Sequence, residues 1–139
     1  MRLLESVEEF ASEKIITVFG CGGDRDKSKR PLMAEAVAKS MTRNDGDFAI
    51  ITNDNPRSED PAEINSQIEA GMKKNLKDNK RWGVIPDREK AIKKAIGMAR
   101  KSDVVIIAGK GHETYQQIGK ARRHFDDRKM ARNILKSLT

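Results

Sequence analysis

Cysteine, aromatic residues and long apolar runs are all scarce in this chain of 139 residues, and each scarcity excludes a class of protein. The single cysteine excludes an internal disulfide and agrees with a reducing compartment. No apolar run reaches the length of a membrane span, and no signal peptide opens the sequence. Only six residues are aromatic, so stacking platforms for single-stranded nucleic acid are scarce. These absences predict a cytoplasmic protein with no membrane segment.

Charge, in contrast, is abundant. The chain has 28 Lys and Arg against 21 Asp and Glu, a net charge of +7. Such a surplus favours anionic partners, but along the sequence the cations are scattered, with the densest groups at 73–74, 77–81 and 122–123. The first group falls at a predicted helix end, where cations complement the helix dipole without a partner. We therefore expect a solvated basic face, and the sequence disfavours a nucleic-acid patch.

Apolar periodicity predicts strands that alternate with helices. The predicted strands are 15–19, 48–51, 82–85 and 104–108, with a strand or hairpin at 115–125. The predicted helices are 3–11, one from Pro31, one from Pro61, one capped by Asp87 and a last one capped by Asp126 or Asp127. This order predicts a single α/β domain over residues 1–139, a Rossmann-like three-layer sandwich whose mostly parallel sheet has helices on both faces.

Three details of this fold can be checked directly. The run 104–108 is the most apolar in the chain, which predicts a central strand with Val105 and Ile107 as buried as Val104 and Ile106. The spacing of the last helix predicts buried Met130, Ile134, Leu135 and Leu138. Gly71 and the basic run after it predict the end of the helix that begins at Pro61.

Three polar loops, at 20–30, 52–60 and 109–113, each follow an apolar strand. If these strands are parallel, the loops share one edge of the sheet, where open α/β sheets bind their ligands. The side chains brought together would be Arg25, Asp54, Asn55, Arg57, Lys110, His112 and Glu113. Such a set offers cations for carboxylates or phosphates and acids for ammonium groups.

The segment Thr52–Arg57 is the densest of these loops. It offers a guanidinium, a carboxylate and an amide within four residues, which suits a zwitterionic ligand better than a phosphate. An Asx-type turn with a solvated Arg57 explains the same residues. Both interpretations remain open at this point.

Several familiar motifs are excluded. The run Gly20-x-Gly22-x-x-Arg25 lacks the third glycine of a dinucleotide fingerprint, and Gly109-Lys110-Gly111-His112 lacks the spacing of a phosphate-binding P-loop. Two histidines and a lone cysteine give no zinc spacing. Cys21 has no assigned base, which favours a small residue in a tight turn over a nucleophile. We expect no metal site.

Four blocks, in order, resemble the C-terminal domain of the Mur ligases, and most closely their meso-diaminopimelate-adding members. They are Val18–Met33, Asp54–Arg57, Ala108–Gln116 and Phe125–Arg128. The resemblance covers nearly the whole chain. In that family the central domain binds ATP with Mg²⁺ and makes an acyl phosphate on a nucleotide-linked dipeptide, which the amine of the incoming amino acid attacks.

The resemblance also implies roles for individual residues. By motif, Arg25, Asn55, Arg57, Gly109 and Glu113 match positions that hold meso-diaminopimelate, with Asp54 beside them. A second set is expected near the nucleotide: Asp24, Lys27, Arg30, Lys110 and His112. No residue here is expected to be catalytic, and no cofactor is expected to bind this domain alone.

Some family features are missing. The ATP-binding loop and the modified lysine have no match, the strand before the first helix is absent, and residues 41–47 are longer and more polar than expected. We therefore expect an excised or split-off domain, truncated at its N-terminus, whose partners are the missing N-terminal and central ligase domains and which is inactive alone. The alternative is a stand-alone basic module that kept the fold and binds nucleotide, nucleic acid or protein.

Overall fold

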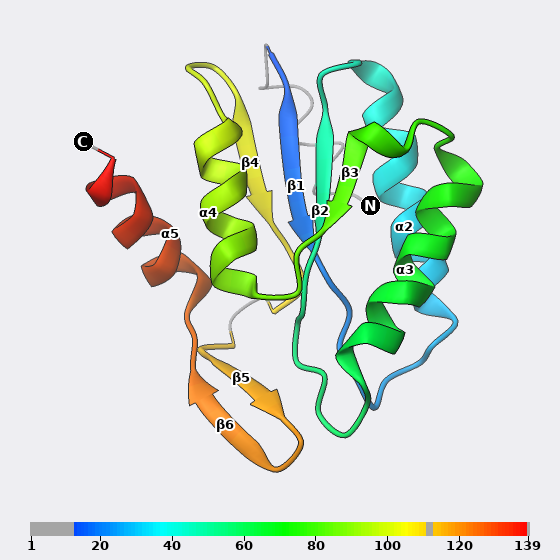
Figure 1. Cartoon of the computed structure of the whole chain (residues 1–139), viewed down its shortest axis with the longest axis vertical. Helices are drawn as coiled ribbons and strands as arrows, with labels where there is room; N and C mark the ends of the chain where they lie inside the picture. Colours follow the sequence, from blue (N-terminus) through cyan, green and yellow to red (C-terminus); the bar gives the residue numbers. More distant parts are fainter. Residues whose placement is uncertain (1–12, 111–112, 139) are drawn as a thin grey trace.

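The computed structural model describes residues 13–110 and 113–138 (Figure 1). Its elements are β1 (Ile15–Phe19), α2 (Lys29–Ser40), η1 (Met41–Arg43), β2 (Phe48–Ile51), α3 (Pro61–Asn75), η2 (Asn79–Arg81), β3 (Trp82–Val84), α4 (Arg88–Met98), β4 (Val104–Ile107), β5 (Tyr115–Ile118), β6 (Ala121–His124) and α5 (Asp127–Ser137). The predicted helix at 3–11 lies outside the described residues.

The main sheet is parallel and has the order β3-β2-β1-β4. The predicted strands at 15–19, 48–51 and 104–108 are therefore parallel neighbours, as expected. Helices α2 and α3 pack on one face of this sheet and α4 and α5 on the other, which confirms the α/β three-layer fold (Figure 1). The chain winds from β1 to β3 and then returns through α4 to β4. The carboxyl ends of β1 and β4 thus flank a topological switch point, where such folds bind ligands.

Helix starts follow the capping residues in the sequence. Asp60 accepts a hydrogen bond from the backbone N–H of Ala62, with Pro61 at the first helical position of α3. Asp87 caps α4 in the same way through Lys90. Helix α2 begins at Lys29, slightly before the predicted start at Pro31.

Helix α3 ends at Asn75, directly after the basic pair Lys73–Lys74, as the sequence predicted, but Gly71 lies inside the helix and does not end it. The reason is packing against α2. A Cβ at position 71 would lie 2.7 Å from the Cβ of Ala34 and 3.1 Å from the Cα of Pro31. The glycine therefore allows two helices to approach closely and is no stop signal.

The prediction that β4 is a central strand is wrong. Among the described strands, β4 pairs only with β1 and lies at the edge of the main sheet. Ile106 is buried at 6% exposure, while Val104, Val105 and Ile107 are only half-buried. An apolar run shows that both faces of a strand are covered, but it does not show where the strand lies in the sheet.

The predicted burial of α5 is also wrong in part. Asp126 caps the helix and Ile134 is buried, as expected. Leu135 and Leu138, in contrast, are 54% and 62% exposed. Helix α5 packs mainly against α4 at the edge of the sheet, so its apolar stripe is wider than the surface available to cover it.

The polar segment 41–47 is a fixed turn. Its Asp47 is 3% exposed and accepts the backbone N–H of Ile15 at 2.7 Å, which anchors the start of β1. Arg81 donates to the backbone carbonyls of Met41 at 2.6 Å and Asn44 at 2.7 Å. Asp47 thus satisfies a backbone group of β1, and Arg81 satisfies backbone groups of this segment.

Candidate functional site

The three polar loops meet at the carboxyl edge of the sheet, as the sequence predicted. The backbone N–H of Gly23 in the first loop donates to the carbonyl of Asn55 in the second at 2.8 Å. The side chain of Asn55 donates to Glu113 Oε1 of the third loop at 3.2 Å. The described members of the predicted binding set, Arg25, Asp54, Asn55, Arg57, Gly109 and Glu113, thus lie on neighbouring loops.

Arg57 is held in a defined orientation. Its φ of +52° is unusual for a residue with a side chain, and its guanidinium Nη1 donates to the carbonyls of Gly23 at 3.0 Å and Asn55 at 3.3 Å. Nη2 lies 3.6 Å from Glu113 Oε2. Gly22 makes room for this arrangement, because a Cβ there would lie 2.8 Å from Nη1. The Nη1 side of the guanidinium is therefore fixed by backbone carbonyls, and the Nη2 side faces Glu113 across a long ion pair.

The hairpin β5–β6 holds this loop from the other side. The backbone N–H of Gln117 donates to Asn55 Oδ1 at 2.5 Å, and the backbone N–H of Arg57 donates to the carbonyl of Gln117 at 3.0 Å. Gln116, 2% exposed, donates its side-chain amide to the carbonyl of Asp54 at 2.9 Å. The hairpin thus fixes the backbone of the residues at the centre of the site, and neither glutamine was expected from the sequence.

Asp54 is the most buried acid of the site, at 5% exposure. Its Oδ1 accepts the backbone N–H of Asn55 at 2.6 Å, and burial raises the pKa of this carboxyl against the opposing charge of Arg88. Gly109 has a φ of +120°, and a Cβ there would lie 2.5 Å from Asp54 Oδ2. The glycine is therefore required both for the backbone conformation and for the approach of the carboxylate.

A small cavity of about 190 Å³ opens beside Asp54 and Gly109. The exposed side chain of Arg25 lines it, as does the half-buried thiol of Cys21. Burial, followed by the nearby charge of Asp54, raises the pKa of Cys21 to about 11. The thiol is therefore protonated at neutral pH, which agrees with a small residue in a tight turn and argues against a nucleophile.

Two residues that the resemblance places near a nucleotide are buried here. Arg30 is 1% exposed and donates to the carbonyl of Gly22 at 3.2 Å, to Gln67 at 3.0 Å and to Glu59 at 3.0 Å. Lys110 is 2% exposed, and its Nζ donates to the carbonyls of Phe125 at 2.6 Å and Glu113 at 2.8 Å. Burial lowers the pKa of Lys110, opposed by Asp127. Both cations tie the site loops to the body of the fold.

The other residues expected near the nucleotide are Asp24, Lys27 and His112. Asp24 is exposed, with a φ of +55°, and accepts the hydroxyl of Ser58. This hydrogen bond is the main reason that the pKa of Asp24 lies below its ordinary value. Lys27 is exposed at the rim of the first loop. His112 lies outside the described residues.

Arg88 is a supporting residue that the sequence did not reveal. It is fully buried and makes a two-pronged ion pair with Asp127, at 2.8 and 2.7 Å. It also donates to the carbonyls of Asn53 at 2.9 Å and Ala108 at 3.3 Å. From the sequence, Asp126–Asp127 was interpreted only as a helix cap. Asp126 does cap α5, but Asp127 pairs with Arg88. The pair joins the ends of β2 and β4 to the start of α5.

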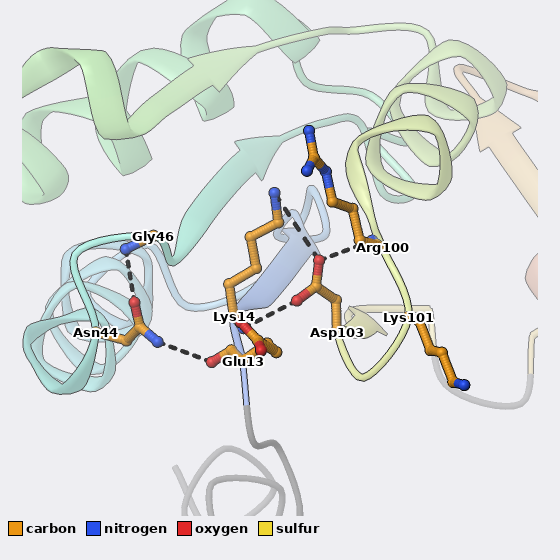
Figure 2. A pocket seen from close by; sticks show the side chains of 7 residues that line it. All are labelled: Glu13, Lys14, Asn44, Gly46, Arg100, Lys101 and Asp103. Carbon is orange, nitrogen blue, oxygen red and sulfur yellow. Dashed lines mark hydrogen bonds and ion pairs between the residues drawn. The ribbon is translucent and has the colours of Figure 1, made fainter.

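A second polar pocket lies at the opposite, amino edge of the sheet (Figure 2). There Asp103 accepts the backbone N–H groups of Lys14 at 3.1 Å and Arg100 at 2.7 Å, and Lys14 Nζ lies 3.9 Å away. The carboxylate thus closes the turn before β4, and the pocket lacks the convergent loops of the carboxyl edge.

Within residues 13–110 and 113–138, His, Cys, Asp and Glu side chains form no group of three suited to a metal ion. In the same part of the chain, no helix is both long and apolar enough to cross a membrane.

Comparison with known proteins defines the class of this protein. Residues 1–111 match the family model described as Mur ligase, glutamate ligase domain. The chain belongs to the Mur ligase family.

Two similar relatives carry the same name. The chain is 52% identical, over 98% of its length, to UDP-N-acetylmuramoyl-L-alanyl-D-glutamate--2,6-diaminopimelate ligase of Clostridioides difficile (strain 630). It is 51% identical, over 96% of its length, to the ligase of that name from Caldanaerobacter subterraneus subsp. tengcongensis. A solved structure of a ligase with this name superposes with a TM-score of 0.78 at 41% identity and covers 99% of the chain.

In each of these comparisons the chain spans 26% of the relative's length. It matches the C-terminal domain of this ligase. The resemblance stated from the four sequence blocks is thereby confirmed.

Proposed function

We propose that this chain is the amino-acid-binding domain of an ATP-dependent ligase that joins meso-diaminopimelate to a UDP-N-acetylmuramoyl dipeptide. The observation that carries the proposal is the fixed guanidinium of Arg57 facing Glu113 at 3.6 Å at the carboxyl edge of the sheet. A cation and an acid side by side are complementary to the carboxylate and ammonium of one amino-acid centre. The names of the relatives supply the substrate class.

In this proposal the ligand binds between Arg57 and Glu113, and its charged groups replace their long ion pair. A carboxylate of meso-diaminopimelate binds the free edge of the Arg57 fork, and an ammonium binds Glu113. Asn55 and Asp54 hold the loop that carries Arg57, and Gly109 keeps the approach open. Arg25, exposed on the first loop, lines the cavity next to them. Lysine lacks the distal carboxylate, so it would leave a desolvated cation unpaired and bind less well.

The remaining chemistry belongs to partner domains in the proposal. Those domains bind ATP and Mg²⁺ and convert the dipeptide carboxyl into an acyl phosphate. The other amino group of the bound diaminopimelate, in its neutral form, attacks that group, displaces phosphate and loses a proton as the amide bond forms. The roles of Asp24, Lys27 and His112 near the nucleotide remain predictions. We expect the purified chain alone to form no amide bond. Phosphate release that depends on diaminopimelate from this chain alone would contradict that expectation.

The alternative, a stand-alone basic interaction module, is not favoured. Relatives about half identical over nearly the whole chain are all named as one ligase. The loops that resemble the ligase motifs also keep mutually supporting hydrogen bonds.

A calorimetric titration with meso-diaminopimelate tests the proposal. Arg57→Ala is expected to weaken binding by about 2–4 kcal/mol, the range for removing one partner of a desolvated charge pair. Arg57→Lys should recover only part of this loss, since an ammonium cannot form the two-pronged contact. The matched control is Arg100→Ala, at the opposite edge of the sheet (Figure 2), which should leave the affinity unchanged.

The outcome that contradicts the proposal is equal affinity in Arg57→Ala and Arg100→Ala. Unfolding of each variant in urea separates a lost ligand contact from a lost fold, because Arg57 also binds two backbone carbonyls. If the isolated chain binds too weakly to titrate, the same substitutions in a full-length relative give the readout. There the ratio of diaminopimelate to lysine use should fall in Arg57→Ala.

A further inference from the structure

The positive charge of the chain is concentrated on one face of the fold. We define the basic face as residues 88–101 and 126–138, which comprise α4, α5 and their flanks. These residues include ten Lys and Arg against three Asp and Glu, a surplus that equals the net charge of +7 for the whole chain. Helices α2 and α3 on the opposite face have five Lys and Arg against three Asp and Glu. The fold thus brings together the two segments that carry the positive surplus.

Three cations of the basic face are exposed and have no acidic partner. Lys90, Lys93 and Lys94 are all exposed on α4, and none of them forms an ion pair with any residue of the described chain. They surround a shallow hollow of about 450 Å³ that also includes Gly97 and Met98. Because no acid neutralises these ammonium groups, they are available to an anionic partner.

Exposed apolar side chains lie on the neighbouring segment, which packs against α4 through α5. Leu135 of α5 and Leu138, at the C-terminal cap of that helix, are 54% and 62% exposed. Arg132 precedes Leu135 by one helical turn, so cations and leucines share the outer surface of α5. A helix with exposed leucines bordered by Lys and Arg is typical of segments that bind at the interface of an anionic bilayer.

This combination favours lipid over nucleic acid. A phosphate backbone would satisfy the lysines but offers nothing to two exposed leucines. The basic face contains no Phe, Tyr or Trp on which a base could stack. A bilayer with anionic headgroups is complementary to both features, since its phosphates meet the cations and its acyl boundary receives the leucines.

We propose that the basic face docks this chain on the surface of an anionic phospholipid bilayer. Lys90, Lys93 and Lys94 lie against the headgroups, and Leu135 and Leu138 enter the acyl boundary. The candidate amino-acid site lies at the carboxyl edge of the sheet and not on this face, so it stays open to its ligand. The proposal therefore does not depend on the proposed ligase function.

Flotation with vesicles tests the proposal. The chain is mixed with vesicles of phosphatidylcholine alone or of phosphatidylcholine with phosphatidylglycerol, whose anionic headgroups attract polybasic segments. Binding is expected only to the anionic vesicles and should weaken as salt rises. The triple variant Lys90→Gln/Lys93→Gln/Lys94→Gln should bind roughly 100-fold more weakly, at about fivefold for each lost cation.

The matched control removes the same charge from the other face. Lys73, Lys74 and Lys77 are likewise exposed, and their triple change to Gln alters the net charge by the same amount. It should change vesicle binding far less than the α4 triple does. The pair Leu135→Ser/Leu138→Ser should weaken vesicle binding without changing the surface charge, and all three variants should keep the affinity for meso-diaminopimelate.

Three results would overturn the proposal. One is the absence of binding to anionic vesicles at low salt. Another is an equal loss in the two lysine triples, which would indicate attraction by net charge alone. The third is tighter binding to duplex DNA or to an acidic polypeptide than to the vesicles, with no effect of the leucine changes. Failure of meso-diaminopimelate binding leaves these readouts untouched.

Discussion

The two helical layers cover the same sheet in different ways. On one face, α2 and α3 approach so closely that Gly71 has no room for a Cβ. On the other face, α5 leaves Leu135 and Leu138 exposed, and a Cβ at Gly97 of α4 would meet nothing within 4 Å. The first layer seals the core. The second carries the positive surplus and, through Arg88, holds the ends of two strands beside the site.

This difference shows what stabilises each layer. The α2–α3 layer depends on close apolar packing, with side chains such as Ile68 and Met72 fully buried. The α4–α5 layer has an apolar cluster of its own, but it also depends on a buried ion pair. Substitutions matched between the layers can therefore test the comparison.

The largest effect is expected from Arg88→Ala. The change leaves the carboxylate of Asp127, whose side chain is 13% exposed, without its partner, together with the carbonyls of Asn53 and Ala108. Breaking a buried pair in this way should lower the free energy of unfolding by about 3–5 kcal/mol, measured by urea denaturation. The matched control is Arg128→Ala, because Arg128 is 73% exposed and lies 3.9 Å from Asp126. It should cost less than about 1 kcal/mol.

A double variant distinguishes the contribution of the ion pair to stability from that of packing. Arg88→Met combined with Asp127→Leu removes both charges, and such replacements are often neutral or stabilising. The double variant should therefore recover much of the stability that Arg88→Ala loses. If Arg88→Ala and Arg128→Ala cost the same, the buried ion pair does not stabilise the α4–α5 layer in the way described.

On the other face, Gly71→Ala should destabilise the protein by about 1–3 kcal/mol, the range for overpacking a well-packed contact. The added methyl would lie 2.7 Å from the Cβ of Ala34 and 3.2 Å from the carbonyl oxygen of Pro31, so α2 and α3 must separate. The midpoint of urea unfolding measures the cost. A loss below about 0.5 kcal/mol would mean that the α2–α3 contact adjusts easily.

Cys21 packs against the α2–α3 cluster. The reactivity of its thiol therefore measures how well that side of the fold excludes solvent. With the pKa of Cys21 raised to about 11 by burial, alkylation by iodoacetamide should be slow at pH 8 and accelerate only toward pH 11. In the unfolded chain the thiol ionises near pH 8.5. Between these values the unfolded state binds fewer protons than the folded state, so the stability should fall as pH rises. Fast alkylation of the folded chain at pH 8 would contradict the assignment.

The sequence predicted the order of elements and the convergence of the loops well. Apolar runs and capping residues such as Asp60 and Asp87 are local signals, and they are confirmed. Parallel strands then require their following loops to share an edge, so the neighbourhood of Arg57, Asn55 and Glu113 follows from topology.

Properties that depend on distant packing were not predictable. The apolar run of β4 gave no sign that it lies at the sheet edge, because strand order is set by pairing across the whole chain. Arg88 looked like any exposed residue in a first helical turn, and its partner Asp127 comes 39 residues later. The meeting of two basic segments, 88–101 and 126–138, on one face is likewise a product of the fold.

The smallest expected effect is an increase in stability. Gly97 lies in the last turn of α4 with an ordinary helical backbone, since it is absent from the positive-φ glycines of the described chain. A Cβ there would project into open space, so Gly97→Ala should add helix propensity without a clash. The expected increase in the free energy of unfolding is about 0.5–1 kcal/mol, chiefly because alanine restricts the unfolded chain. Gly71→Ala is the matched control, because the same methyl added on the close-packed face should have the opposite sign. If both substitutions stabilise the protein, the two faces tolerate an added methyl equally and the contrast between the layers fails.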